Sequence, residues 1–261
     1  MTRPPVTANK ELGQHFLVDE NILRVIERLA ELDASDTVLE IGPGLGVLTA
    51  FLAERVALVH AVELDMTLEP ALRERLAAYA NVRLLFADAL QVDLAAFDPP
   101  AAKLVANLPY NVATPLVVES LDGIPSLDRW CVMVQREVAD RFFATPGTKA
   151  YGAVSVLLQL ATERTGFHPV SREVFRPRPN VDSALVAFRR RRLPARFPEL
   201  KALVQGAFAH RRKTVPNSLE LAGTASRPEA AAALAAIGRP PETRAEALAP
   251  DEFPTLLEAL A

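Results

Sequence analysis

Three carboxylates around a glycine-rich loop are the residues of this sequence best spaced to bind a nucleotide-like ligand. Glu40 comes just before the loop at residues 42–46, and Glu63 and Asp88 each follow an apolar run typical of a buried strand. A carboxylate about 20 residues beyond such a loop is placed to accept the hydroxyls of a ribose. Three acids would repel a pyrophosphate, but they suit a ligand with a positive end, hydroxyls and an adenine amino group. S-adenosylmethionine has all three, although each acid could instead cap a helix or face solvent.

The loop departs from the glycine pattern of dinucleotide-binding proteins. With Gly42 and Gly44 as the first two glycines, the third would fall at Val47, and Gly46 comes one residue early. The loop also lacks the G-K-S/T ending of a phosphate cradle. A nicotinamide-dependent dehydrogenase is therefore a disfavoured alternative, and nothing near residue 107 resembles a hydride acceptor site.

The four residues 107–110 have the chemistry to act on the exocyclic amine of an aromatic base. The Asn107 side-chain oxygen and the Leu108 carbonyl could hold the hydrogens of an adenine amine and stabilise the positive charge that develops as a methyl group arrives. Pro109 would stiffen the loop, and Tyr110 would stack on a base that has left its own stack. An ordinary turn is the alternative, but the segment ends a fourth apolar run and so belongs at the same sheet edge as the acids.

A second aromatic residue lies on a proline-stiffened loop at residues 174–183. Phe175 on this loop could face Tyr110 across the target base. It could equally fill the core beneath the loop.

The distribution of charge predicts contact with a polyanion. The net charge is −3, yet residues 1–163 carry −9, residues 164–213 carry +10 and residues 214–261 carry −4. A basic segment between acidic ones is typical of nucleic-acid binding. A solvent-exposed edge strand whose arginines discourage pairing with another chain would have the same composition. The basic residues expected to contact RNA are Arg176, Arg178, Arg211, Arg212 and Lys213.

Strands and helices alternate from residue 37 onward, and this alternation predicts the sheet that would bring these groups together. It is typical of an α/β fold: a Rossmann-like sheet, parallel and covered by helices on both faces, with ligands at the carboxyl ends of the strands. The expected strands are residues 37–41, 58–63, 82–86, 103–106, 129–134 and 184–188, with helices at 46–54 and 67–78 in between.

Length and composition predict two domains. The 261 residues, 50% of them hydrophobic, can bury a full α/β core and leave enough chain for a smaller second domain. We expect residues 1–192 to form the ligand-binding domain, with residues 1–36 as an N-terminal segment and first helix. Asp19 is the expected N-cap of that helix. The segment at residues 9–17 ahead of it could close over the ligand loop, or residues 14–16 could simply dock the N-terminus. Residues 193–261 are expected to form a helical C-terminal domain.

The remaining composition predicts a cytoplasmic protein. The single Cys131 lies in an apolar run and has no intrachain disulfide partner, which is typical of a buried thiol in a reducing compartment. No apolar stretch approaches the roughly 18 residues that span a bilayer. Residues 1–10 also lack the hydrophobic segment of a signal peptide.

An ordered set of motifs resembles one enzyme family, from about residue 9 to the C-terminus. The set is similar to the ribosomal RNA adenine dimethyltransferases that modify small-subunit RNA. The motifs are L-G-Q-H-F-L at 12–17, E-I-G-P-G-L-G at 40–46, E-L-D at 63–65, D-A at 88–89, N-L-P-Y at 107–110, Q-R-E-V at 135–138, V-F-x-P-x-P-x-V-D-S at 174–183 and H-R-R-K-T at 210–214.

The resemblance implies a function in detail. The substrate would be two adjacent adenosines in a hairpin near the 3′ end of small-subunit (16S) rRNA in a precursor particle. Each would be methylated twice, with four molecules of S-adenosylmethionine consumed. The resemblance also implies a helical C-terminal domain, which the basic residues 211–213 predict to contact RNA. Nothing in the sequence indicates an obligate dimer or a metal site, so we expect a monomer without a bound metal. By the family pattern the cofactor-binding residues would be His15, Leu17, Gly42, Glu63, Asp88 and Asn107.

Two departures from the family pattern and two alternatives stay open. Many members have Asn where this chain has His15, and Val215-Pro216 interrupts what is usually a more continuous basic helical segment. A large-subunit rRNA adenine methyltransferase of the antibiotic-resistance type shares the N-terminal motifs. An assembly factor that acts mainly by binding RNA would also explain the basic segment.

Overall fold

The computed structural model describes residues 14–110 and 112–260, and the chain folds into two compact units. The first unit contains the described residues up to Ala139 together with Arg164–Arg190. The second contains Asp140–Glu163 and the residues from Arg191 onward. The second unit therefore includes residues 140–163, whereas the C-terminal domain predicted from the sequence contains only residues 193–261. The role expected for that domain stays a prediction.

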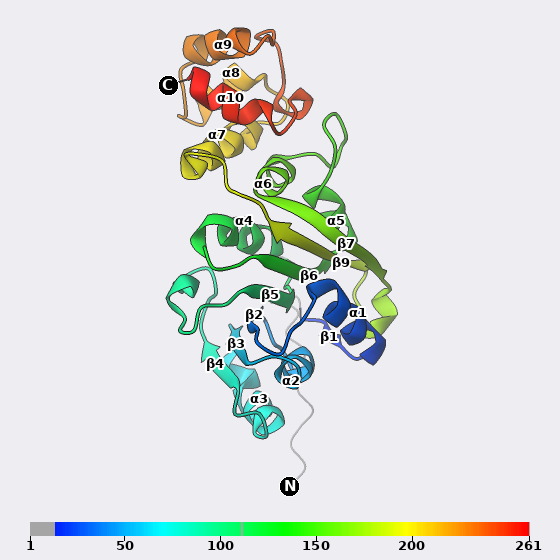
Figure 1. Ribbon diagram of the computed structural model, residues 1–261. Helices are drawn as coiled ribbons and strands as arrows, with labels where there is room; N and C mark the ends of the chain where they lie inside the picture. The colour runs from blue at the N-terminus through cyan, green and yellow to red at the C-terminus, as the bar shows by residue number, and fades with distance from the viewer. Residues whose placement is uncertain (1–13, 111, 261) are drawn as a thin grey trace. The chain divides into compact units, whose positions relative to one another are not determined.

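A seven-stranded sheet forms the centre of the first unit (Figure 1). Its strands are β2 (Thr37–Ile41), β3 (Leu58–Glu63), β4 (Val82–Phe86), β5 (Lys103–Asn107), β6 (Arg129–Gln135), β7 (Thr162–Val170) and β9 (Ser183–Arg190). They lie in the order β4-β3-β2-β5-β6-β9-β7. Strands β2 to β6 run parallel, and β9 is antiparallel to β6. The predicted Rossmann-like α/β fold is confirmed.

Helices cover both faces of this sheet, which explains why its central strands are apolar on both sides. The helices of the first unit are α1 (Glu20–Ala30), α2 (Val47–Ala53), α3 (Glu69–Leu76), α4 (Ala113–Gly123) and α5 (Arg136–Phe142), the last of which continues into the second unit. On one face, Cys131 of β6 belongs to a core cluster that includes residues of α1 and α2. On the other face, the neighbouring Trp130 stacks on Phe188 of β9, with ring centroids 5.3 Å apart, and donates a 2.8 Å hydrogen bond to Ser120 of α4. Figure 1 shows α1 and α4 on opposite sides of the sheet.

The first helix begins where the sequence predicts. Asp19 is the N-cap of α1, and its side chain accepts a 2.7 Å hydrogen bond from the backbone of Asn21. The helix ends at Glu31, which adopts a left-handed conformation with φ +48°. The carbonyl of Glu31 accepts a hydrogen bond from Lys103 at the start of β5, and Lys103 also forms a 2.7 Å ion pair with Asp36. This buried contact joins α1 to the amino end of the sheet.

Three strands were not predicted. Strand β7 lies at one edge of the sheet and contains Gly166 and Pro169, which weaken the strand signal in the sequence. A separate two-stranded sheet pairs β1 (Phe16–Leu17) with β8 (Phe175–Arg176) in antiparallel fashion. These two-residue strands are too short to give a periodic pattern. Through them the N-terminal segment is tied to the loop that follows β7.

The second unit is helical. Its helices are α6 (Ala153–Ala161), α7 (Phe197–Ala209), α8 (Val215–Leu221), α9 (Arg227–Ala236) and α10 (Glu252–Ala259). Phe208 of α7 contacts the rings of Tyr151 and Phe253, at centroid distances of 5.8 and 6.0 Å. Helix α7 ends before the basic residues 211–213, and α8 begins at Val215 with Pro216 in its first turn. The basic residues therefore lie in a turn after α7, the position relative to that helix that the sequence predicted.

Short helical turns complete the fold. They are η1 (Met66–Leu68), η2 (Leu94–Ala96), η3 (Arg172–Val174) and η4 (Ala245–Ala247). Within the part of the chain that the structure describes, no helix has both the length and the apolar character needed to cross a membrane.

Candidate active site

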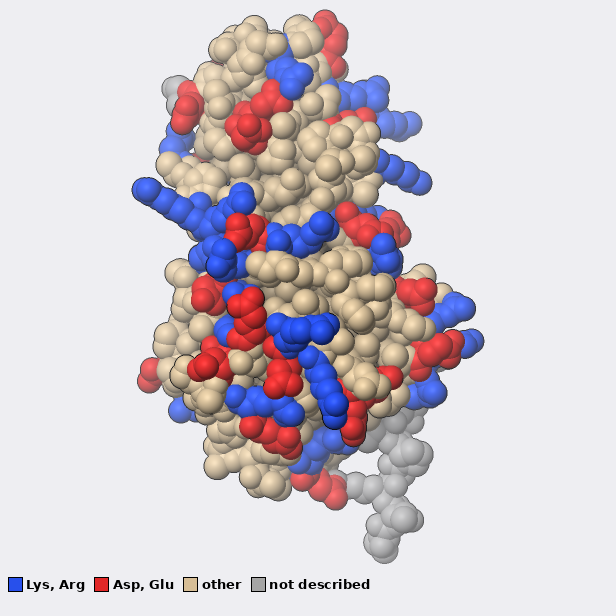
Figure 2. Space-filling view, turned by 45° about the vertical axis from the view of Figure 1, so that its right-hand side comes forward, with Lys and Arg blue, Asp and Glu red and all other residues tan. Residues whose placement is uncertain are grey.

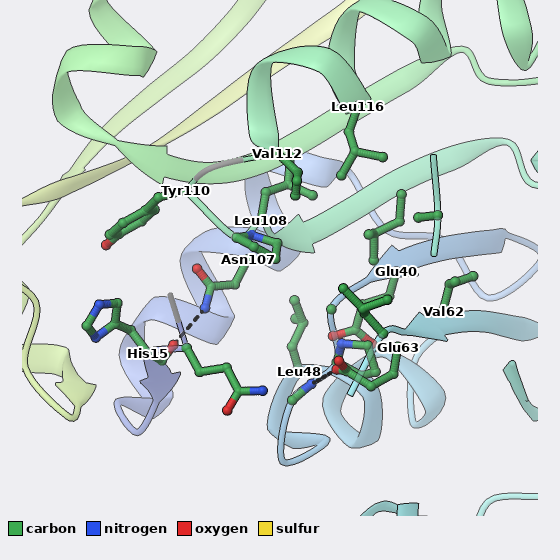
Figure 3. A pocket seen from close by; sticks show the side chains of 18 of the residues that line it. His15, Glu40, Leu48, Val62, Glu63, Asn107, Leu108, Tyr110, Val112 and Leu116 are labelled. Carbon is green, nitrogen blue, oxygen red and sulfur yellow. Dashed lines mark hydrogen bonds between the residues drawn. The ribbon is translucent and has the colours of Figure 1, made fainter. Parts of the chain in front are cut away.

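A pocket opens in the first unit where the strand order of the sheet reverses. Strand β2 has β3 on one side and β5 on the other, so the connections leave in opposite directions and a crevice forms at the carboxyl ends of the strands. Nine sequence-predicted site residues line this pocket (Figure 3). They are His15, Leu17, Gly42, Glu63, Asp88, Asn107, Leu108, Pro109 and Tyr110. Which ligand atoms each of them contacts stays a prediction.

The glycine loop after β2 lies directly against the loop after β5. Gly42 has φ +73°, and a Cβ atom at this position would lie 3.4 Å from the ring of Pro109. Gly44 has φ +59°, and a Cβ atom there would lie 3.0 Å from the ring of Phe16. Both positions require a residue that adopts a left-handed backbone and carries no side chain. The glycines thus let the predicted cofactor loop approach both the Asn107 loop and the N-terminal segment.

The pocket is strongly acidic at one end. Glu40 and Glu63 are 1% and 5% exposed, and Figure 3 shows both at the end of the pocket opposite His15. Glu63 accepts hydrogen bonds from the backbone of Gly44 at 3.0 Å and of Asp65 at 2.9 Å, but burial still raises its pKa. The pocket lining, among the described residues, contains no Lys or Arg. This end of the pocket therefore suits a ligand with a positive charge.

Residues 14–17 form a strap along the pocket. Gln14 donates a 2.7 Å hydrogen bond to Asp65, which follows β3. Phe16 and Leu17 form β1, which pairs with β8, and all four strap residues line the pocket. Both sequence expectations for this segment agree with these contacts, since Phe16 lies against Gly44 of the ligand loop and the pairing of β1 with β8 docks the segment on the first unit.

The strap also orients Asn107. The side-chain amide nitrogen of Asn107 donates a 3.1 Å hydrogen bond to the carbonyl of His15 (Figure 3). Because the nitrogen of this planar amide is held by His15, the side-chain oxygen points away from the strap, and no donor to it is found among the described residues. The Leu108 amide is bound to the carbonyl of Met133 at 3.0 Å, which fixes the next peptide. The structure thus presents Asn107 as a hydrogen-bond acceptor.

Tyr110 is held from two sides. Its hydroxyl is 2.8 Å from the hydroxyl of Ser183, which is buried at the start of β9. Burial is the main reason that the pKa of Tyr110 is raised. The His15 ring lies 5.6 Å from the Tyr110 ring, centroid to centroid, and its Nδ1 atom is 2.8 Å from the carbonyl of Pro177. These contacts fix a flat aromatic surface at the pocket end opposite the acids.

Phe175 does not reach the pocket. Its side chain is fully buried in the core cluster beneath the strap and is absent from the pocket lining. Of the two roles considered for Phe175, the structure agrees with core filling and corrects its placement across a base from Tyr110. The reason is the pairing of β8 with β1, which turns this aromatic residue inward.

The predicted RNA-contacting residues differ in how they are engaged. In the first unit, Arg176 donates to the carbonyls of Glu173 and Phe175, and Arg178 forms an exposed 2.8 Å ion pair with Glu173. In the second unit, Arg211 donates to the carbonyl of Lys149 at 2.6 Å and pairs with Glu246 at 3.4 Å. Arg212 and Lys213 beside it are exposed. Their contact with RNA stays a prediction.

Sequence reasoning missed the role of Ser183. It is the last residue of the V-D-S motif, but nothing in its type or spacing indicates that it meets Tyr110, 73 positions earlier. The depth at which Glu40 is buried was also missed, because the sequence shows only an acid within an apolar run.

Comparison with known proteins assigns the chain to a family. Residues 6–260 match the family model of ribosomal RNA adenine dimethylase. The chain belongs to the ribosomal RNA adenine dimethylase family. The match spans both units, so the helical second unit belongs to the family pattern as well as the methyltransferase-like sheet.

The relatives of this rRNA adenine dimethylase family member include bacterial enzymes and solved structures. The chain is 50% identical over 248 residues to the ribosomal RNA small subunit methyltransferase A of Rubrobacter xylanophilus, and the alignment covers 95% of this chain and 93% of the relative. A dimethyladenosine transferase from Plasmodium falciparum is similar in structure, with a TM-score of 0.77, 26% identity and coverage of 93% of this chain and 96% of the other. The 23S rRNA methyltransferase ErmE gives a TM-score of 0.66 at 29% identity, covering 94% of this chain and 99% of that structure.

Proposed function

We propose that this protein dimethylates the exocyclic amino nitrogen of two adjacent adenosines in a hairpin near the 3′ end of small-subunit (16S) rRNA. S-adenosylmethionine would be the methyl donor and a precursor of the small ribosomal subunit the substrate. The observation that carries the proposal is the contact between the Gly42 loop and Pro109, which joins the predicted donor site and the predicted base site in one pocket. The extent of the family match supports the same activity.

The residues of the pocket fit this donor. The left-handed glycines 42 and 44 leave space along the backbone, and Glu63 is buried at the end of β3, where a carboxylate is suited to ribose hydroxyls. Asp88 lines the next part of the pocket. When bound, S-adenosylmethionine supplies a methyl group activated by a sulfonium charge. The acidic end of the pocket stabilises that charge, and a pyrophosphate would be repelled there.

Methyl transfer to an adenine amine needs little acid–base chemistry from the protein. The amine is a poor nucleophile because its lone pair is delocalised into the ring. The side-chain oxygen of Asn107, held outward by the His15 carbonyl, accepts a hydrogen from the amine and stabilises the positive charge that develops on nitrogen. The Leu108 carbonyl is the expected second acceptor. Tyr110, fixed by Ser183, stacks on the everted base and keeps it in register with the methyl group.

The assignment to the small subunit is tested by the product. Purified protein, incubated with labelled S-adenosylmethionine and either immature small or large subunits, should produce dimethyladenosine in small-subunit rRNA only. Mass spectrometry of rRNA digests locates the modification. Dimethyladenosine in large-subunit rRNA alone would support the alternative that the structural likeness to the 23S rRNA methyltransferase ErmE suggests.

A role in ribosome assembly by RNA binding is a second proposal, and it is compatible with the first. The +10 charge of residues 164–213 supports it. Binding to immature subunits should weaken steeply as salt rises, because bound counterions are released from the RNA. A flat salt response would count against it. The monomeric state and the cytoplasmic location stay predictions.

A further inference from the structure

The imidazole ring of His15 lies at the base end of the pocket, although the family pattern counts His15 among the cofactor-binding residues. Its centroid is 5.6 Å from that of the Tyr110 ring, and Figure 3 shows both rings at the end opposite Glu40 and Glu63. The Nδ1 atom of His15 is 2.8 Å from the carbonyl of Pro177. Because a carbonyl can only accept, Nδ1 carries a proton and donates it, which holds the ring in place. Both contacts put the ring beside the predicted base site.

The neighbouring side chains of the strap face the other way. Gln14 donates to Asp65, which follows β3, and Phe16 lies against Gly44 of the ligand loop. In an extended chain successive side chains point to opposite sides, so the side chain of His15 points away from the groups that Gln14 and Phe16 contact. The strap thus divides its side chains between the two ends of the pocket: Gln14 and Phe16 contact the donor end, and His15 contacts the base end.

We propose that the His15 ring binds the target base, as a second flat surface beside Tyr110. This inference rests on the proposed methylation of an everted adenosine. The sequence predicted Phe175 as the second aromatic group, but Phe175 is buried in the core. A base held between two rings needs roughly 7 Å, twice the spacing of stacked bases. The 5.6 Å between the His15 and Tyr110 centroids leaves no such gap, so the base lies against both rings from one side.

His15 also connects this surface to the other groups expected to contact the substrate. Pro177, whose carbonyl holds the His15 ring, lies between Arg176 and Arg178, two of the residues expected to contact RNA. The backbone carbonyl of His15 accepts the hydrogen bond that orients Asn107. A single residue thus joins the acceptor for the adenine amine, the flat surface for the base and the basic loop. An imidazole suits this position because stacking on a base needs only a flat ring.

The test compares two substitutions of the partly buried His15, both of which keep the backbone carbonyl that holds Asn107. His15→Asn removes the ring but supplies the amide that many family members have at this position. It should raise the KM for immature small subunits roughly tenfold, the typical cost of one lost base–aromatic contact, and weaken the quenching of 2-aminopurine at the target position of an rRNA hairpin. His15→Phe keeps a flat ring and should recover most of both losses. In both variants the dissociation constant of S-adenosylmethionine, measured by calorimetry, should stay within about twofold of wild type.

The matched comparison is Gln14→Ala, at the adjacent strap position that faces the donor end. This variant should weaken donor binding about fivefold through the lost hydrogen bond to Asp65, and should leave the KM for subunits within about twofold of wild type. An unchanged KM in His15→Asn, with or without weaker donor binding, would overturn the inference. Equal losses in His15→Asn and His15→Phe would also overturn it, because the hydrogen bond to Pro177 and not the ring would then be responsible. Wild-type protein that fails to methylate small-subunit rRNA would instead defeat the proposed function.

Discussion

The hydrogen bond between Tyr110 and Ser183 offers a sharp test of the base platform. The two hydroxyls are 2.8 Å apart, and Ser183 is 1% exposed at the start of β9. Ser183→Ala removes the contact without creating a large cavity, and the freed Tyr110 hydroxyl can turn to water because Tyr110 is only partly buried. The aromatic ring then loses its fixed position, while the donor end of the pocket is unchanged.

The expected cost follows from the geometry. A neutral, partly buried hydrogen bond contributes about 1 kcal/mol net. If that energy positions the target base, its loss lowers kcat by about fivefold. Affinity for S-adenosylmethionine should stay within about twofold of wild type, because Ser183 does not line the pocket. The effect should therefore separate catalysis from donor binding.

The assay combines kinetics with fluorescence. Steady-state methylation of immature small subunits gives kcat, and calorimetry gives the donor affinity. An rRNA hairpin with 2-aminopurine at the target position reports base stacking, since the fluorescence of an everted base is quenched when it stacks on Tyr110. Ser183→Ala should reduce that quenching. Ser35→Ala, which removes an exposed hydroxyl bonded to Asp33, is the matched control and should change neither signal.

A double-mutant cycle with Tyr110→Phe decides whether the contact itself matters. Both single variants should lose activity to a similar degree, and the double variant should be little worse than either one. Strictly additive losses would show that the two hydroxyls act independently. Unchanged kcat and quenching in Ser183→Ala would refute the positioning role.

Two further substitutions test the scaffold around the pocket. Lys103→Met breaks a buried ion pair at the amino end of β5, so the free energy of unfolding should fall by about 3 kcal/mol in denaturant titrations. The control Arg73→Met breaks an exposed ion pair and should lower the free energy of unfolding by less than about 0.5 kcal/mol. In the second test, Gly44→Ala puts a Cβ atom 3.0 Å from Phe16 at φ +59° and should weaken donor binding about tenfold, as measured by calorimetry. The control Gly147→Ala has a similar φ of +79° but open space around it, and it should leave donor affinity unchanged. Equal losses of donor affinity in both variants would show that displacement of the strap is not the cause.

The parts of the fold that were predictable are those with strong local patterns. The strand, loop and helix around Gly42 follow from an apolar run, glycines and a resumed helical pattern, and the structure has them at Thr37–Ile41 and Val47–Ala53. The convergence of Glu63 and Asn107 at one sheet edge followed from topology alone, because parallel strands end on the same side.

The features that escaped prediction depend on contacts between distant segments. Strand β7 is an edge strand with a proline, so its pairing with the sheet has no periodic signature. The inward position of Phe175 depends on the pairing of β8 with a two-residue strand some 160 positions earlier. The bond from Asn107 to the His15 carbonyl involves backbone, which carries no residue-type signal. Such contacts emerge only when the chain is folded.

The most direct test of the central claim is Asn107→Ala, measured for turnover and for donor affinity in the same preparation. Methylation of small-subunit rRNA should fall by about 100-fold or more, because the acceptor for the adenine amine is gone. The dissociation constant of S-adenosylmethionine should rise by no more than about fivefold, the cost of the lost hydrogen bond to His15. Full turnover in this variant would contradict the proposal that Asn107 steers the adenine amine toward the methyl group.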